Sequence, residues 1–173
     1  MNIGSTMAMN ARRHPDKEAI VYGNKRYTYR EFNEKVNRLA NGLKNLNVQK
    51  GDKVALVMKN SDDYAVCFYA SAKIGAVLVP INFRLVSKEV RYILEQSDTK
   101  FVFCDDELAE NVEKSRSGNT LIQEVICTSS SFFTYCTSFS LYSVESIYDY
   151  RILPWCDSYH PPGFSSNIHI GND

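Results

Sequence analysis

Four side chains in the first half of the chain are of types that often do chemistry. Asp62 and Asp63 are adjacent carboxylates of the kind used in general acid–base catalysis. His14 could carry a proton near neutral pH, and Cys67 could act as a nucleophile if its thiol were ionised. Each also has a structural explanation, because helix dipoles favour aspartate in a first turn and histidine in a last turn. Cys67 falls on an apolar helix face with no Lys or Arg nearby, so we predict no catalytic residue here.

Another group of residues could bind a ligand rather than react with it. The loop Pro80-Ile81-Asn82 follows an apolar run, and loops at the carboxyl ends of parallel strands are where α/β folds bind ligands. Gly75 precedes that run and suits the left-handed residue that ends a helix. Turn geometry explains both features without a ligand, so we predict no cofactor-binding residue.

Potential metal ligands gather near the end of the chain: Cys136, Cys156, His160 and His169. They are separated by nineteen, three and eight intervening residues, which does not match the short paired spacings of a zinc finger. We therefore predict no metal site.

The elements that would position these residues follow from the hydrophobic pattern. Residues 18–22 and 25–29 flank Gly23-Asn24, which predicts a β-hairpin. An amphipathic helix capped by Thr28 or a neighbour is predicted next, with apolar residues three or four apart: Phe32, Val36, Leu39, Leu43 and Leu46.

Strands and helices then alternate to about residue 127. Strands are predicted at 53–58, 77–81, 101–104 and 121–127, and continuous apolar runs such as VALVM are typical of parallel strands covered on both faces. Ser61 is predicted to cap the helix after the first of these strands, and Ser87 the helix after the second. Repeated βα units with short connections predict an α/β fold with a mainly parallel sheet, preceded by the hairpin.

Composition excludes several classes of partner. Twenty Lys and Arg balance twenty Asp and Glu, so charge favours neither nucleic acid nor an anionic membrane. Residues 64–81 are apolar but contain Lys73 and Pro80, which argues against a transmembrane segment. The start has no apolar secretory signal, and the five cysteines lack the pattern of secreted domains. Together these features predict a cytoplasmic protein.

The character of the sequence changes after about Thr128. No lysine follows Lys114, and Ser, Tyr, Phe and Cys crowd together without a helical or alternating period. We predict an α/β domain at residues 1–128 and an irregular or disordered tail at residues 129–173.

Two motifs in the first part resemble one enzyme family. YTYREF at residues 27–32 resembles the first core motif of the AMP-forming acyl-CoA synthetases and ligases, and AKIGAVLVPIN at 72–82 resembles the second. The similarity continues through EVRYILEQSDTKFVF at 89–103 and covers about residues 10–127 in the family's order. The resemblance implies an incomplete N-terminal subdomain of the adenylate-forming fold.

The resemblance also implies a chemistry. Family members activate a carboxylic acid with ATP and magnesium, release pyrophosphate and transfer the acyl group to coenzyme A. This needs a phosphate-binding loop, an acidic residue on the ribose and a lysine that meets the developing charge. In the family these groups follow the segment matched here. The resemblance therefore assigns no catalytic, cofactor or metal residue to this chain, and it implies a truncated fragment that is inactive alone.

The last residues suggest an origin for the tail. GFSSNIHIGND at 163–173 can be encoded so that dropping one nucleotide yields DLAAIYTSGTT, which resembles the family's phosphate loop. We hypothesise that a single-nucleotide frame slip after about Thr128 replaced the family sequence. Coding DNA in which no shifted frame encodes SGTT near the end would contradict this hypothesis.

Two other interpretations stay open. The chain could be a non-catalytic interaction module that binds a protein partner, such as a full-length relative, through an unfinished sheet face. It could also be a self-contained nucleotide-binding α/β domain, although the sequence contains no Gly-x-Gly-x-x-Gly or Walker loop.

Overall fold

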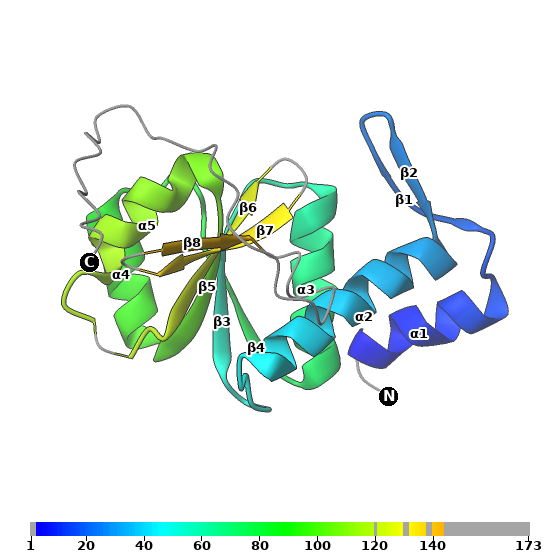
Figure 1. Ribbon diagram of the computed structural model, residues 1–173, viewed down its shortest axis with the longest axis horizontal. Helices are drawn as coiled ribbons and strands as arrows, with labels where there is room; N and C mark the ends of the chain where they lie inside the picture. The colour runs from blue at the N-terminus through cyan, green and yellow to red at the C-terminus, as the bar shows by residue number, and fades with distance from the viewer. Residues whose placement is uncertain (1–2, 120, 130–131, 138–139, 144–173) are drawn as a thin grey trace, which may run out of the picture.

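The structure, a computed structural model, describes residues 3–119, 121–129, 132–137 and 140–143, with side chains as far as Thr128. Helices cover both faces of a twisted sheet, and a two-stranded hairpin stands away from it (Figure 1). Cys156, His160 and His169 lie outside the described residues, as does the side chain of Cys136. The predicted lack of a metal site among these four stays a prediction.

The chain begins with a helix and the hairpin. α1 (Ile3–Arg13) leads into strands β1 (Glu18–Tyr22) and β2 (Lys25–Thr28), which pair antiparallel. Gly23 has a φ of 56° at the turn, a left-handed value that glycine adopts without strain. The predicted hairpin is confirmed, and its second strand ends one residue earlier than expected, at Thr28.

The second helix starts with reciprocal capping bonds. α2 (Tyr29–Asn45) follows Thr28, whose Oγ1 accepts from the N–H of Glu31 at 3.3 Å. The Thr28 N–H donates in turn to Glu31 Oε2 at 2.8 Å. The predicted apolar face is buried at Phe32, Val36, Leu39 and Leu43.

Among the described residues, the main sheet contains four parallel strands, β3 (Lys53–Val57), β4 (Val77–Pro80), β5 (Thr99–Asp105) and β6 (Glu124–Ser129). Antiparallel strands β7 (Phe132–Thr137) and β8 (Ser140–Ser143) extend it, giving the order β4-β3-β5-β6-β7-β8. The predicted α/β fold with parallel βα units is confirmed. β7 and β8 lie in the region predicted to be irregular, where the sequence offers no alternating period.

The helices between strands are α3 (Asp62–Ile74), α4 (Ser87–Gln96) and, after a short 3-10 helix η1 (Asp106–Leu108), α5 (Ala109–Arg116). The predicted start of α3 is confirmed, because Ser61 Oγ accepts from the N–H of Tyr64 at 3.0 Å. Its predicted end is confirmed too, because Gly75 takes the left-handed φ of 81°.

The predicted N-cap at Ser87 is wrong. Ser87 is the first residue of α4, and its hydroxyl bonds to Asn111 Oδ1 of α5 at 2.6 Å. The N–H of Val86, the residue before the helix, donates instead to Glu89 Oε2 at 3.0 Å. The side chain of Glu89, from within α4, therefore accepts a backbone hydrogen bond at the start of this helix.

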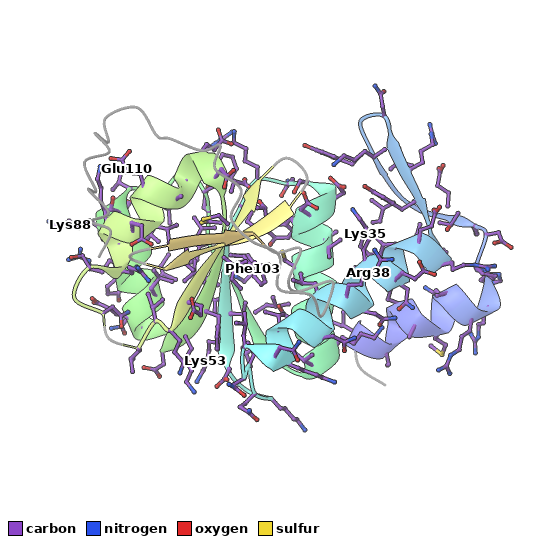
Figure 2. The ribbon with its side chains drawn as sticks, in the orientation of Figure 1. Lys35, Arg38, Lys53, Lys88, Phe103 and Glu110 are labelled. Atoms are coloured by element: carbon purple, nitrogen blue, oxygen red, sulfur yellow. The ribbon has the colours of Figure 1, made fainter. Side chains whose placement is uncertain are left out.

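Two apolar clusters lie on opposite faces of the parallel strands. On one face α1, α2 and α3 cover Val54, Leu56, Phe101, Phe103 and Ile126. On the other face α4 and α5 cover Ala55, Val57, Val102, Cys104, Val125 and Cys127. Figure 2 shows Phe103 among the strands, with Glu110 on α5 at the side away from the hairpin. Coverage of both faces explains the continuous apolar runs in β3 and β5.

β4 is an edge strand of the described sheet, not the buried strand that was predicted. Val77 is 48% exposed. The N–H groups of Val77 and Ile81 donate to β3-side carbonyls of Asp52 and Leu56. Alternation along the strand therefore places the nitrogen of Pro80 on the outer side, where its missing hydrogen removes no ladder bond.

β6 also begins later than predicted. The prediction started the strand at Leu121, whereas the structure starts it at Glu124. Leu121 lies in a turn and is exposed, so its apolar side chain belongs to the connection and not to the sheet.

The apolar stretch at residues 64–81 divides between α3, which ends at Ile74, and β4. Within the described ranges, no helix is long and apolar enough to cross a bilayer.

Candidate functional site

The connections that follow the strands leave the carboxyl edge of the sheet toward opposite faces, which makes a topological switch point between β3 and β5. α3, which follows β3, packs on one face, whereas α5, which follows β5, packs on the other. β3 and β5 are neighbours in the sheet, so the chain leaves these two adjacent strands toward opposite faces. Open α/β sheets bind ligands outside the carboxyl ends of strands at such a point. This switch point is the best candidate site in the described fold.

The carboxylate of Asp105 bridges the strand ends at this switch point. Asp105 Oδ2 accepts from the N–H of Lys59, just after β3, at 2.7 Å, and Oδ1 accepts from Thr128 Oγ1, in β6, at 3.1 Å. The same hydroxyl lies 3.4 Å from the carbonyl oxygen of Cys104. One side chain thus connects the ends of three adjacent strands. The sequence prediction missed Asp105, although a carboxylate directly after a buried strand was a usable signal.

Acidic groups surround this bridge. Burial, and then the charge of Asp105, raises the pKa of Asp106. Burial, and then the charge of Asp62, raises the pKa of Asp63 at the start of α3. Lys59 pairs with Glu107, and this hydrogen bond is the main reason that the pKa of Lys59 is raised.

These carboxylates do not form a metal site. In the part of the chain that the structure describes, no three His, Cys, Asp or Glu side chains are grouped so that they could hold a metal ion. The residues present therefore do not fit Mg²⁺ by themselves, and we assign no step of a reaction through that ion.

Asp62 lies at the start of α3 and bonds to the hairpin. It is only 2% exposed. Its Oδ2 accepts from the hydroxyl of Tyr27 at 2.8 Å, and Lys25 Nζ lies 3.2 and 3.3 Å from its two oxygens. Lys35 Nζ, from α2, lies 3.9 Å away, and Figure 2 shows this lysine on the helix next to the hairpin. The buried carboxylate therefore joins β2, α2 and α3.

The charge on Asp62 is favoured by its partners. Burial alone would raise its pKa, but the hydrogen bonds from Tyr27 and Lys25 and the charges of Lys25 and Lys35 outweigh burial and lower it. Burial and the bond to Asp62 raise the pKa of Tyr27 to about 12. These contacts give Asp62 a structural role, and its lack of a catalytic one stays a prediction.

The other candidate residues have separate surroundings. His14 is exposed just after α1, where its backbone N–H donates to the carbonyl oxygen of Asn10 at 2.8 Å. Cys67 is buried in α3, and burial raises the pKa of its thiol well above the usual value. Asn82 forms a turn, because its oxygen atoms accept from the N–H groups of Arg84 and Leu85 at 3.0 and 3.1 Å. Among the described hydrogen bonds, none connects these residues to Asp105.

Comparison with known proteins identifies the fold. The profile of the AMP-binding enzyme family matches residues 7–140. The chain belongs to the AMP-binding enzyme family. The match extends past the break predicted at Thr128 and includes β7. The division into parts at 1–128 and 129–173, and the frame slip, stay predictions.

The chain is also similar in sequence to individual ligases. A long-chain-fatty-acid–CoA ligase of Mycobacterium tuberculosis is 44% identical over 103 residues, covering 58% of this chain and 20% of that protein. A fatty acid–[acyl-carrier-protein] ligase of Streptomyces coeruleorubidus is 37% identical over 109 residues, covering 63% and 21%. The chain thus spans about a fifth of the curated relatives it matches.

Solved structures of AMP-binding enzymes agree with the fold. The N-terminal domain of FACL13 from Mycobacterium tuberculosis superposes with a TM-score of 0.69 at 36% identity, covering 74% of this chain and 34% of that one. Coronafacic acid ligase from Pectobacterium brasiliense gives a TM-score of 0.70 at 27% identity, covering 76% and 26%.

Proposed function

We propose that this chain supplies the first part of the α/β framework of an enzyme that activates a carboxylic acid with ATP and transfers the acyl group to coenzyme A. The family match over residues 7–140 carries the proposal. Support comes from relatives whose names specify fatty acids or crotonobetaine and carnitine as acids, and CoA or an acyl carrier protein as acceptor. A cytoplasmic location fits that chemistry.

We further propose that residues 1–173 do not catalyse this reaction alone. The polar groups at the switch point bond to one another, since Asp105 accepts from both Lys59 and Thr128. Asp62 is likewise occupied by Lys25 and Tyr27. On this proposal the described residues form a scaffold, and the groups that contact ATP, magnesium and coenzyme A come from other parts of the enzyme.

ATP–pyrophosphate exchange tests both parts of the proposal. The chain alone, given magnesium and a panel of carboxylic acids, should show no exchange above background. A chimera in which residues 1–128 replace the matched segment of the 44% identical ligase should retain exchange within about tenfold of its parent. The parent ligase is the positive control.

The two failures are distinguishable. Exchange by the isolated chain would refute its inactivity. A chimera that folds, as judged by circular dichroism, but shows no exchange would refute the role as a family framework.

The alternative of a protein-interaction module stays a prediction with less support. Both faces of β3 and β5 are covered by helices, so these two strands offer a partner no open face, and the described sheet has its edges at β4 and β8. The β4 edge is four residues long and ends in Pro80, which limits strand addition there.

A further inference from the structure

Two cysteine side chains face each other across β5 and β6. Cys104 and Cys127 are register partners on these parallel strands, although they lie 23 residues apart in the chain. Their Sγ atoms are 3.4 Å apart. Both are buried in the cluster under α4 and α5, with exposures of 0% and 2%. The fold, rather than the local sequence, brings the two thiols together.

The geometry suits a covalent bond between them. Adjacent strands lie about 4.7–4.9 Å apart, within the range of roughly 4.4–6.8 Å between Cα atoms that a disulfide spans. Both side chains belong to the same apolar cluster, so both leave the sheet on the same face. The sulfur atoms must approach by about 1.4 Å to reach the bonded distance, which rotation of the two side chains can supply.

We propose that Cys104 and Cys127 form a dithiol site that a peroxide converts into a disulfide linking β5 to β6. One thiol, after losing its proton, attacks a peroxide oxygen and breaks the O–O bond, giving a sulfenic acid and one molecule of water. The second sulfur displaces the hydroxyl group, which leaves as a second water. Two S–H bonds are lost, one S–S bond forms, and hydrogen peroxide is reduced to two waters.

The dithiol site lies next to the candidate functional site. Cys104 immediately precedes Asp105, and Cys127 immediately precedes Thr128, whose hydroxyl bonds to Asp105 at 3.1 Å. A disulfide would therefore fix the spacing of the β5 and β6 ends one residue below that bridge. This inference does not depend on the proposed ligase function.

Burial sets the conditions of the reaction. A peroxide reaches the thiols only when α4 and α5 separate transiently from the sheet, so the rate of linkage should rise in urea too dilute to unfold the chain. Cys67 is an internal control, because it is buried in the cluster on the opposite face.

The test uses the 173-residue chain carrying C136S and C156S, treated with hydrogen peroxide, alkylated in denaturant and digested with trypsin. Cys104 and Cys127 then lie in different peptides, 101–114 and 117–151. We expect these peptides to be linked and about 2 Da lighter than their sum, with Cys67 alkylated. Links that include Cys67, as a misfolded chain would give, or separate oxidation of Cys104 and Cys127, would overturn the proposal.

Single substitutions provide the matched controls. C104S and C127S should each abolish the link, whereas C67S should leave it intact. Phenylarsine oxide, which needs two adjacent thiols, should bind the parent chain at least about tenfold more tightly than either C104S or C127S. Equal binding by the parent and both variants would contradict the proposed pairing.

Discussion

Replacing Asp62 by asparagine should destabilise the fold and loosen the hairpin. Asparagine keeps the size of the side chain but removes the charge that Lys25 and Tyr27 contact at 3.2 and 2.8 Å. Hydrogen bonds to charged groups contribute about 1.5–3 kcal/mol to stability. The contribution of Lys25 should lie near the lower end of that range, because its side chain is half exposed and solvent screens its charge. We expect D62N to lower the free energy of unfolding by about 1.5–3 kcal/mol.

The neighbouring carboxylate provides a control. Burial and the charge of Asp62 raise the pKa of Asp63, so its ionised form is disfavoured in the fold, whereas its place in the first turn of α3 favours negative charge. These effects oppose each other. D63N should therefore change the free energy of unfolding by no more than about 0.5 kcal/mol.

Urea unfolding followed by far-UV circular dichroism measures both variants, and hydrogen exchange reports on the amides of β1 and β2. Equal losses for D62N and D63N would refute the anchoring role of Asp62. So would a D62N variant whose hairpin amides exchange at the parent rate.

The pH dependence of the free energy of unfolding tests independently whether the pKa of Asp62 is lowered in the fold. Because the pKa of Asp62 is lowered in the fold, its stabilising effect is present above the ordinary aspartate pKa of about 3.9 and is lost as the pH falls toward the folded value. The difference between the parent chain and D62N should thus shrink below about pH 4. A difference that grows at acid pH would contradict this assignment.

Two further predictions concern helix packing and capping. G4A should lower the free energy of unfolding by about 1–3 kcal/mol, measured in urea, because a Cβ at Gly4 would lie 2.5 Å from the Cα of Lys73 and would push α1 from α3. S61A should cost about 1 kcal/mol in the same assay because the N–H of Tyr64 loses its acceptor. S87A removes no cap but breaks the bond to Asn111, so its cost should vanish when Asn111 is already replaced by alanine. An S87A loss that persists in the N111A background would contradict the revised start of α4.

Local patterns predicted the elements well where the deciding contacts are close in sequence. The Gly23-Asn24 turn, the Ser61 cap and the Gly75 terminus all depend on residues within one turn of each other, and all three are confirmed. The predicted cap at Ser87 is wrong because its hydroxyl donates to Asn111 of the following helix. Sequence alone cannot reveal that a distant acceptor competes for a serine near the start of a helix.

The site was harder to predict because it depends on strand order. Helix-dipole reasoning located Asp62 correctly, but it could not reveal that Tyr27 and Lys25, 35 and 37 residues earlier, would surround it. Asp105 was missed because its contacts depend on β3 and β5 being neighbours in the sheet, whereas β4 lies between these two strands in the sequence. Sequence gives the run of strands, whereas their order in space is set by long-range packing.

That strand order has a consequence during synthesis on the ribosome. β4 emerges before β5, yet β5 pairs with the opposite side of β3, so a nascent chain that has reached Pro80 leaves one edge of β3 open. Phe101 and Phe103, which fill the cluster under α1–α3, have not been made by then either. A ribosome that pauses between β4 and β5 would leave the apolar strand β3 open to chaperones and to other nascent chains. The open edge of β3 is covered only once β5 has been made and has paired with it.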